Sequence, residues 1–178
     1  MKKVLGSILA LSITLGSAAA FGWDPNEVDD LHGKSQEALA AFKEKDVGIQ
    51  RFIDEAAGYV VIPTVGKGGI GIGGARGKGL LYVGGEPAAV VPLTQLTIGV
   101  QWGGQAYSEF IFFQTNDDLE HFKGGNYELG AQASAVAVTA GASADANYSS
   151  GVAVFTQAKG GLMYEATVGG QKFKVEMK

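Results

Sequence analysis

The sequence predicts an α+β fold that is mostly antiparallel β, with N-terminal helices packed on a curved, glycine-rich sheet or barrel-like sandwich. Glycine makes up 28 of the 178 residues without a collagen period, and only 4 residues are proline, which favours tightly turned β structure. Helical periodicity is concentrated before residue 57, whereas period-two alternation and paired glycines mark most of the rest. The length supports one core, so we expect a single domain over residues 21–178.

Residues 1–20 have the features of a signal peptide rather than of folded structure. A positive start at Lys2-Lys3 precedes an apolar run too short to span a bilayer stably, and Ala18-Ala19-Ala20 forms an A-x-A cleavage site. The sequence contains no cysteine, which excludes a lipoprotein anchor through an N-terminal cysteine and excludes disulfides. We therefore expect cleavage before Phe21 and a periplasmic or secreted protein, most simply a periplasmic one.

Two helices are expected after the cleavage site. The first covers residues 26–42, where Asn26 or Asp24 is placed to cap it and acidic residues fill its first turn. Its apolar residues recur with nearly the helical period at Val28, Leu31, Ala38, Leu39 and Phe42. The second helix covers residues 49–56 and is closed by Gly58. The simplest role for the first helix is to pack on the sheet.

A glycine-rich stretch, residues 58–83, follows the helices. An apolar β-type run ends at Pro63, eight glycines fall between Gly66 and Gly79, and a second apolar run follows. Residues 69–74 formally fit the dinucleotide pattern G-x-G-x-x-G, but that site needs a helix at the loop, and a β-type run follows instead. We expect a β-hairpin or bent strands, with glycine where chains bulge or cross closely.

The remaining chain reads as strands with one short helix. Residues 90–114 alternate as strands do at Leu96, Ile98, Val100 and Trp102, and residues 110–113 predict a strand covered on both faces. Residues 115–122 predict the helix, capped by Thr115 or Asn116 and stopped by Gly124-Gly125. Small, partly β-branched residues favour a strand within 132–146.

Three further strands are expected at the C-terminus. Residues 152–156 and 162–168 flank a Lys-Gly-Gly turn, and Gly169-Gly170 predicts a hairpin. In the last strand, apolar Phe173, Val175 and Met177 alternate with charged residues, which predicts a half-buried strand.

The sequence offers little for catalysis. Its two histidines are His32, on the charged first helix, and His121, which shares a helix face with Asp117. A solvated helix face explains that pair more simply than a metal site, which would need more ligands. No G-x-S-x-G nucleophile elbow is present. Glu109 is an acid within an apolar strand, and it is either a buried functional carboxylate or a side chain that faces water. We expect no enzyme activity, no cofactor and no metal.

An ordered set of motifs resembles the SYLF domain. The opening is Ala57-Gly58-Tyr59-Val60-Val61-Ile62-Pro63, then Lys67-x-Gly69 and the glycine-alternating run to Gly79. The middle is Gly103-Gly104-Gln105, an aromatic strand and Asp118-Leu119-x-x-Phe122, and the end is Leu129-Gly130, a small-residue strand and the segment from Tyr148 to Phe155. The resemblance covers residues 29–175. One departure is Ala57, where the family often has lysine.

The resemblance implies a function in lipid binding. The family occurs in secreted bacterial proteins and in eukaryotic actin-patch regulators, and in the eukaryotic relatives the helical N-terminus takes part in membrane binding. Non-catalytic binding of lipid or a membrane surface in the periplasm is therefore the expected function. A small outer-membrane β-barrel or a structural protein of the cell envelope is the alternative.

The net charge limits the expected partners, and the local distribution of charge indicates the expected binding site. Without Lys2 and Lys3 the 14 basic residues become 12 against 18 acidic ones, a net charge of −6, which argues against nucleic acid as a partner. Residues 24–55 hold nine acids and four bases. The charged residues of the glycine-rich stretch are all cations: Lys67, Arg76 and Lys78. We predict that these three side chains bind an anionic headgroup. The alternative membrane contact is the apolar face of the first helix: Val28, Leu31, Leu39 and Phe42.

Overall fold

The computed structural model describes residues 24–70, 72–98, 104–160 and 167–178. The expected signal peptide and its cleavage site lie outside these residues, as do Val100, Trp102 and most of the strand expected at 162–168. The helices are α1 (Pro25–Lys45), α2 (Ile49–Glu55) and α3 (Asn116–Lys123), close to the predicted boundaries.

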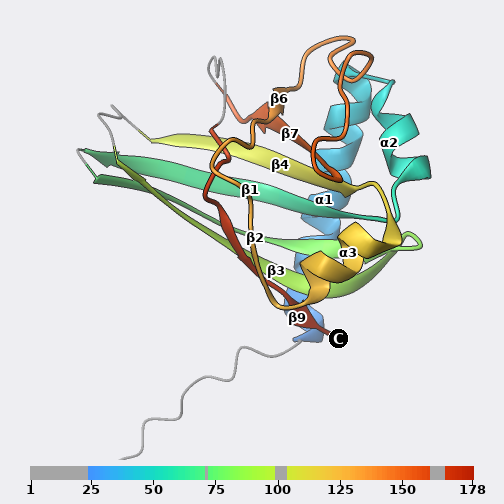
Figure 1. Ribbon diagram of the computed structural model, residues 1–178, viewed down its shortest axis with the longest axis horizontal. Coiled ribbons are helices and arrows are strands. Elements are labelled where there is room, and N and C mark those ends of the chain that lie inside the picture. Colours follow the sequence, from blue (N-terminus) through green and yellow to red (C-terminus); the bar gives the residue numbers. More distant parts are fainter. Residues whose placement is uncertain (1–23, 71, 99–103, 161–166) are drawn as a thin grey trace, which may run out of the picture.

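Nine strands of the described residues form one sheet. They are β1 (Gly58–Ile70), β2 (Ile72–Val83), β3 (Glu86–Ile98), β4 (Gln105–Phe113), β5 (Asn126–Glu128), β6 (Val136–Ala137), β7 (Val152–Ala158), β8 (Lys172–Lys174) and β9 (Glu176–Met177). Their order is β5-β8-β3-β2-β1-β4-β7-β6, and β9 also pairs with β3. The pairs are antiparallel except β6 with β7. The α+β expectation is confirmed, with long strands β1 to β4 forming the body of the sheet (Figure 1).

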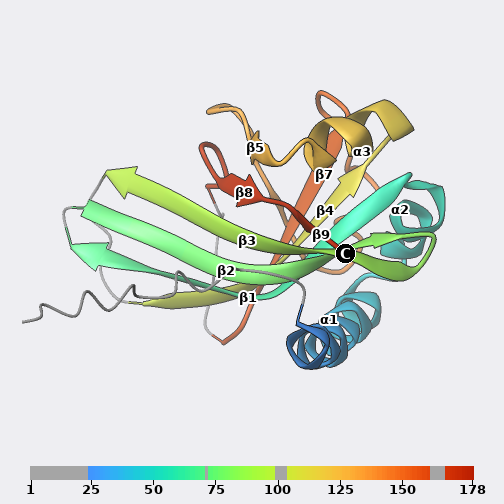
Figure 2. The same cartoon turned by 90° about the horizontal axis from the view of Figure 1, so that it is seen from below.

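The curled sheet is covered on both faces. Figure 2 shows α1 beneath one face, called the α1 face here, and α3, β5 and β8 above the other, called the inner face. The core under α1 is built around aromatic side chains from the helices and strands: Phe42, Phe52, Tyr59, Tyr82, Phe110, Phe112 and Phe155. The inner core contains Val60, Ile62, Val65, Ala75, Leu81, Leu93, Tyr107, Ile111, Phe113, Phe122 and Phe173. Strand alternation therefore divides the apolar residues between two cores.

Local signals explain the helix boundaries. The Asp24 side chain accepts a hydrogen bond from the Asn26 amide at 3.0 Å, which caps α1. Thr115 and Asp118 form a capping box at α3: Asp118 donates its amide to the Thr115 hydroxyl, and its carboxylate accepts from the Thr115 amide. These contacts involve residues close in sequence, which is why the sequence predicts them.

Three elements differ from the expectation. Pro63 does not end the first strand, because β1 runs through it with a register shift between Ile62 and Val65. Residues 132–146 are mostly turns, and only β6 is a strand there. The final strand is divided into β8 and β9, with Phe173 buried and Met177 46% exposed.

Residues 132–146 turn because a distant carboxylate holds them. Asp46 is buried and accepts hydrogen bonds from the Ser143 amide at 2.6 Å and the Ser143 hydroxyl at 2.8 Å. Gly141 has a φ of 77°, a left-handed conformation that suits glycine in a turn. This tertiary anchor outweighs the local β preference of the valines.

Candidate functional site

The three cations predicted as a site do not lie on one face. Along β2, Leu80 and Tyr82 pack under α1, whereas Ala75 and Leu81 pack in the inner core. Arg76 and Lys78 alternate with the inner residues and therefore lie on the α1 face. Lys67 lies two residues beyond Val65, which is in the inner core, so it lies on the inner face. All three cations lie in strands: Lys67 in β1, and Arg76 and Lys78 in β2.

The irregularity at Pro63 causes this separation. Tyr59 and Val61 pack under α1, and strict alternation from them would place Lys67 under α1 as well. The register shift between Ile62 and Val65 reverses the alternation, because both of those residues lie in the inner core. Burial lowers the pKa of Lys67, partly opposed by the charge of Glu109. Nothing in the sequence pattern beyond the proline marks this reversal.

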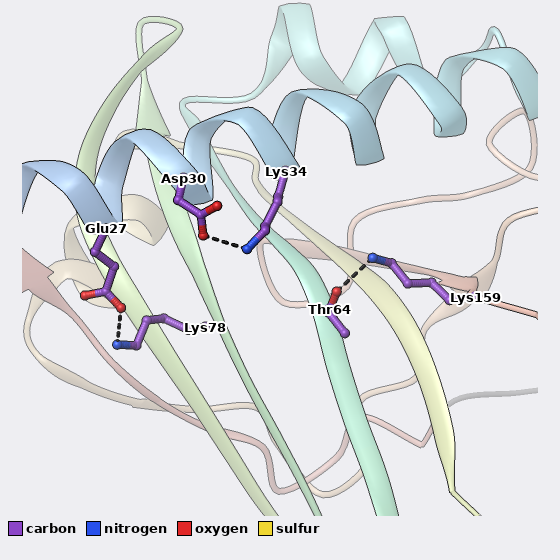
Figure 3. Close-up of polar contacts among 6 residues, drawn as sticks. All are labelled: Glu27, Asp30, Lys34, Thr64, Lys78 and Lys159. Atoms are coloured by element: carbon purple, nitrogen blue, oxygen red, sulfur yellow. Dashed lines mark hydrogen bonds and ion pairs between the residues drawn. The ribbon is translucent and has the colours of Figure 1, made fainter.

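Lys78 forms an ion pair with a residue of the first helix, α1. Its ammonium group lies 2.5 Å from the Glu27 carboxylate, and Figure 3 shows this pair between the start of α1 and β2. Both side chains are about one third exposed, so the pair is only partly screened by water. Lys78 therefore helps to hold α1 on the sheet.

The apolar face of α1 is buried by the sheet. Its members Val28, Leu31, Leu39 and Phe42 are each no more than 8% exposed. Phe42 is fully buried, with its ring centroid 4.7 Å from that of Phe110 and 5.4 Å from that of Phe155. A membrane could contact this face only after α1 leaves the sheet. The described helices include none that is long and apolar enough to cross a membrane.

A groove beside α1 contains two more cations. It has a volume of about 470 Å³ and runs between α1 and strands β1, β4 and β7. Lys34 bonds to Asp30 at 2.6 Å, and Lys159 donates to the Thr64 hydroxyl at 2.8 Å (Figure 3). Lys34 thus has a carboxylate partner next to it, which reduces the positive charge available to a ligand there.

A larger hollow than this groove lies along β1, β2 and β3. Its volume is about 820 Å³, and its lining includes Gly66, Gly68, Gly73, Gly74, Arg76, Gln95, Leu96, Glu128, Gly170 and Lys172. A β-carbon at Gly66 would meet nothing within 4 Å, so part of the hollow is bare backbone beside open space. Leu96 is 75% exposed and gives the hollow an apolar surface. The hollow therefore combines an apolar surface, accessible backbone and two cations.

Of the predicted cations, only Arg76 lines this hollow, and the second cation is Lys172. Sequence reasoning missed Lys172 because it comes from β8, about a hundred residues further along the chain. The Lys172 ammonium lies 3.8 Å from the Glu128 carboxylate, and both side chains are more than half exposed. Such an exposed pair contributes little stability, and its 3.8 Å separation is wider than the 2.6 Å of Lys34 with Asp30, so the Glu128 carboxylate offsets the charge of Lys172 less closely.

A buried polar cluster lies on the inner face of the sheet. Glu109 is fully buried, and Gln171 donates its side-chain amide to the Glu109 carboxyl at 3.0 Å. The same amide lies 3.4 Å from the Tyr107 hydroxyl, and Thr156 faces Glu109 across β4 and β7. Burial raises the pKa of Glu109 to about 8, opposed by its bond from Gln171 and by the charge of Lys67. The sequence allowed Glu109 to be either buried or exposed to water, and the structure shows that it is buried.

The described residues contain no cluster of three or more His, Cys, Asp or Glu side chains placed to hold a metal ion. Residues 94–178 match the family model Ysc84, described as Las17-binding protein actin regulator. The match covers 85 of the 178 residues, and this part of the chain is similar to the Ysc84 family, the SYLF-domain family. The match begins within β3 and includes Glu109, Gln171 and Lys172, but not Lys67, Arg76 or Lys78. A search of curated proteins gives no match. Similarity to this family is consistent with a binding role that is not enzymatic.

Proposed function

We propose that this protein binds anionic lipid or a membrane surface in the periplasm, without catalysing a reaction. The observation that carries the proposal is the hollow, where Arg76 and Lys172 lie beside bare glycine backbone and the exposed Leu96. Cations attract an anionic headgroup, the glycines leave space for it to approach the sheet, and an exposed leucine favours the interfacial region. The family match supports this class of function. The signal-peptide pattern of residues 1–20 supports the location, and release of the protein by osmotic shock would test it.

The test is flotation of the protein with vesicles of phosphatidylcholine that contain or lack phosphatidylglycerol. Each cation near an anionic membrane surface contributes about 1 kcal/mol. Arg76→Ser combined with Lys172→Ser should therefore weaken binding to the anionic vesicles about 30-fold. Binding of the unmodified protein should also fall as salt is added, because salt screens exposed charges.

The matched control removes two cations elsewhere. Lys43→Ser with Lys45→Ser makes the same change in net charge in the exposed last turn of α1. This control should bind nearly as well as the unmodified protein. Equal losses in the two double variants would mean that only net charge matters and that the hollow is not the site. Absence of flotation for the unmodified protein would contradict lipid binding altogether.

A further inference from the structure

A smaller pocket, which shares no lining residue with the hollow, lies at the edge of the inner core. Its volume is about 240 Å³, and it lies between the segment that follows β5 and the turn that leads into β7. Leu129, Val152 and Val154 belong to the inner core and form the apolar part of its lining. We call it the serine pocket, after three serines that also line it: Ser134, Ser149 and Ser150.

One wall of the serine pocket is a tight turn with a fixed geometry. Ser149 and Val152 exchange backbone hydrogen bonds of 2.9 and 3.1 Å across the two residues between them. These two residues, Ser150 and Gly151, have φ angles of 51° and 79°, and positive φ is typical of the favoured two-residue hairpin turns. A β-carbon at Gly151 would collide with the Asp118 carboxylate, so the turn packs directly against the start of α3. The turn therefore holds its two serines in defined positions.

Ser150 adopts a backbone conformation that is costly for serine. It is the one non-glycine residue with a positive φ in the described part of the chain. Glycine would adopt this conformation without strain, because it has no β-carbon. The Ser150 hydroxyl forms no hydrogen bond with the described residues that would offset the strain. Backbone strain is typically retained at functional sites, so this serine indicates that its hydroxyl is used by a ligand of the pocket.

The polar side chains of the pocket are uncharged. Four of them are exposed and have no hydrogen-bond partner among the residues that the structure describes: Gln132, Ser134, Ser149 and Ser150. Hydroxyl and amide groups can both donate and accept hydrogen bonds. The described lining contains no Lys, Arg, His, Asp or Glu. An anionic headgroup or a metal ion would therefore meet no opposite charge here, whereas the hydroxyls of a ligand would meet both donors and acceptors.

The apolar part of the lining limits the ligand further. Leu129, Val152 and Val154 are each no more than 8% exposed, and Tyr127 adds a half-buried aromatic ring. A ligand that fills the pocket must therefore present an apolar face as well as several hydrogen-bonding groups. A sugar ring has both, because its C–H bonds project from the faces of the ring and its hydroxyls project from the edge.

We propose that the serine pocket binds one neutral sugar unit, whose hydroxyls bond to the serines and to Gln132 while one face of its ring lies on the apolar side chains. The volume corresponds to about eight water molecules at about 30 Å³ each, which suits a single sugar ring and excludes a whole phospholipid. A free monosaccharide and the terminal unit of a glycan offer the same chemistry. The proposal goes beyond lipid binding at the hollow and does not depend on it.

Amide NMR spectra of the nitrogen-15-labelled protein test the site directly. Glucose, galactose, mannose and N-acetylglucosamine are each titrated to tens of millimolar, and at least one should shift the amides of residues 129–134 and 149–154 in a saturable way. Glycerol, which has no ring, and glucuronate, whose charge would be unpaired in the pocket, should not saturate. Absence of a saturable shift with all four sugars, or an equal response to glycerol, would overturn the proposal.

The methyl glycoside of the sugar that binds distinguishes the two sources. Methylation blocks the anomeric hydroxyl, as linkage to a further sugar does in a glycan. Retained binding would identify the terminal unit of a glycan as the ligand, and lost binding would identify a free monosaccharide, so either result supports a sugar in the pocket.

Ser150→Gly separates binding from folding. It removes one hydroxyl and should weaken sugar binding about fivefold, the effect of one hydrogen bond. It should not lower the melting temperature, because glycine adopts the positive φ freely. Thr139→Ala is the control, since it removes an exposed hydroxyl that does not line the pocket and should leave sugar binding unchanged.

Two companion variants, Ser149→Ala and Ser134→Ala, each remove another hydroxyl from the pocket and should also weaken sugar binding. Unchanged affinity in all three serine variants would show that the sugar binds elsewhere and would overturn the proposal. Vesicle flotation of Ser150→Gly should match that of the unmodified protein. A protein that binds sugar without floating would refute only the lipid site, and one that floats without binding sugar would refute only the serine pocket.

Discussion

At the scale of single residues, Glu109 has the largest pKa shift among the carboxyl groups that the structure describes. Its neighbours along β4, Tyr107 and Ile111, are in the inner core, so alternation alone places its side chain inward. Sequence spacing cannot show whether that face is covered, because the cover comes from Gln171, 62 residues later. The pattern therefore left two alternatives for Glu109, and long-range packing decides between them.

Glu109 should make the protein less stable as pH rises. In the folded protein its pKa is raised from 4.5 to about 8, so between these values the unfolded chain is ionised while the folded one keeps its proton. Folding therefore takes up a proton in this window, and stability falls from pH 5 to pH 8. The change is several kcal/mol at about 1.4 kcal/mol for each pH unit.

Urea unfolding of the unmodified protein and of Glu109→Gln at pH 5 and pH 8 measures this effect. The variant lacks the titrating group, so the difference in stability between the two proteins should grow in its favour at pH 8. A constant difference across this range would show that Glu109 is already ionised in the folded protein.

At the scale of elements, some features follow from residues close in sequence, and others depend on contacts between distant parts of the chain. The boundaries of α1 and α3 follow from caps and periodicity and were predictable from the sequence. The hairpin of β1 and β2 was predictable from its glycines and apolar runs. The register shift at Pro63 was not, because it depends on how β1 fits both neighbouring strands. One shifted residue placed Lys67 and Arg76 on opposite faces and divided the predicted site.

The same hairpin contains a glycine that the fold requires. A β-carbon at Gly79 would lie 2.1 Å from the Val61 carbonyl oxygen and 2.8 Å from the Ile62 α-carbon, beside the register shift. Because these are backbone atoms in a buried strand, they cannot move aside cheaply. Gly79→Ala should therefore destabilise the protein by at least about 1–3 kcal/mol, the usual cost of overpacking.

Gly66→Ala is the matched control, since a β-carbon there meets nothing within 4 Å and the residue lies in the same hairpin. Thermal unfolding should show a lower melting temperature for Gly79→Ala and little change for Gly66→Ala. Equal effects in the two variants would mean that glycine in this hairpin serves chain flexibility rather than close packing.

At the scale of the whole molecule, the sheet has a core on each face, and this limits how the protein can meet a membrane. The core under α1 uses the helix residues that the sequence offered as a second membrane contact. Releasing them would expose Phe42, Phe110 and Phe155 together. The hollow needs no such rearrangement, because its glycines, Leu96 and cations already line an open surface. Lipid binding at the hollow is thus compatible with an intact fold.

Phe42→Ala distinguishes the two modes of binding. Phe42 is fully buried, so truncation should cost about 3–5 kcal/mol of stability and lower the melting temperature by roughly 10 °C. If α1 stays on the sheet during binding, the variant should still float with anionic vesicles, like the unmodified protein, at temperatures well below its melting transition.

Phe122→Ala is the control for this last experiment, because Phe122 is equally buried but belongs to α3 in the inner core. Both variants lose an aromatic ring from a core, and both should keep flotation if the hollow is the site. Loss of flotation in Phe42→Ala alone would show that the aromatic face of α1 enters the membrane, since the cost to stability is matched. The hollow would then be excluded as the main membrane contact. The ion pair between Lys78 and Glu27 would be the next contact to test by substitution, because it fastens the start of α1 to β2.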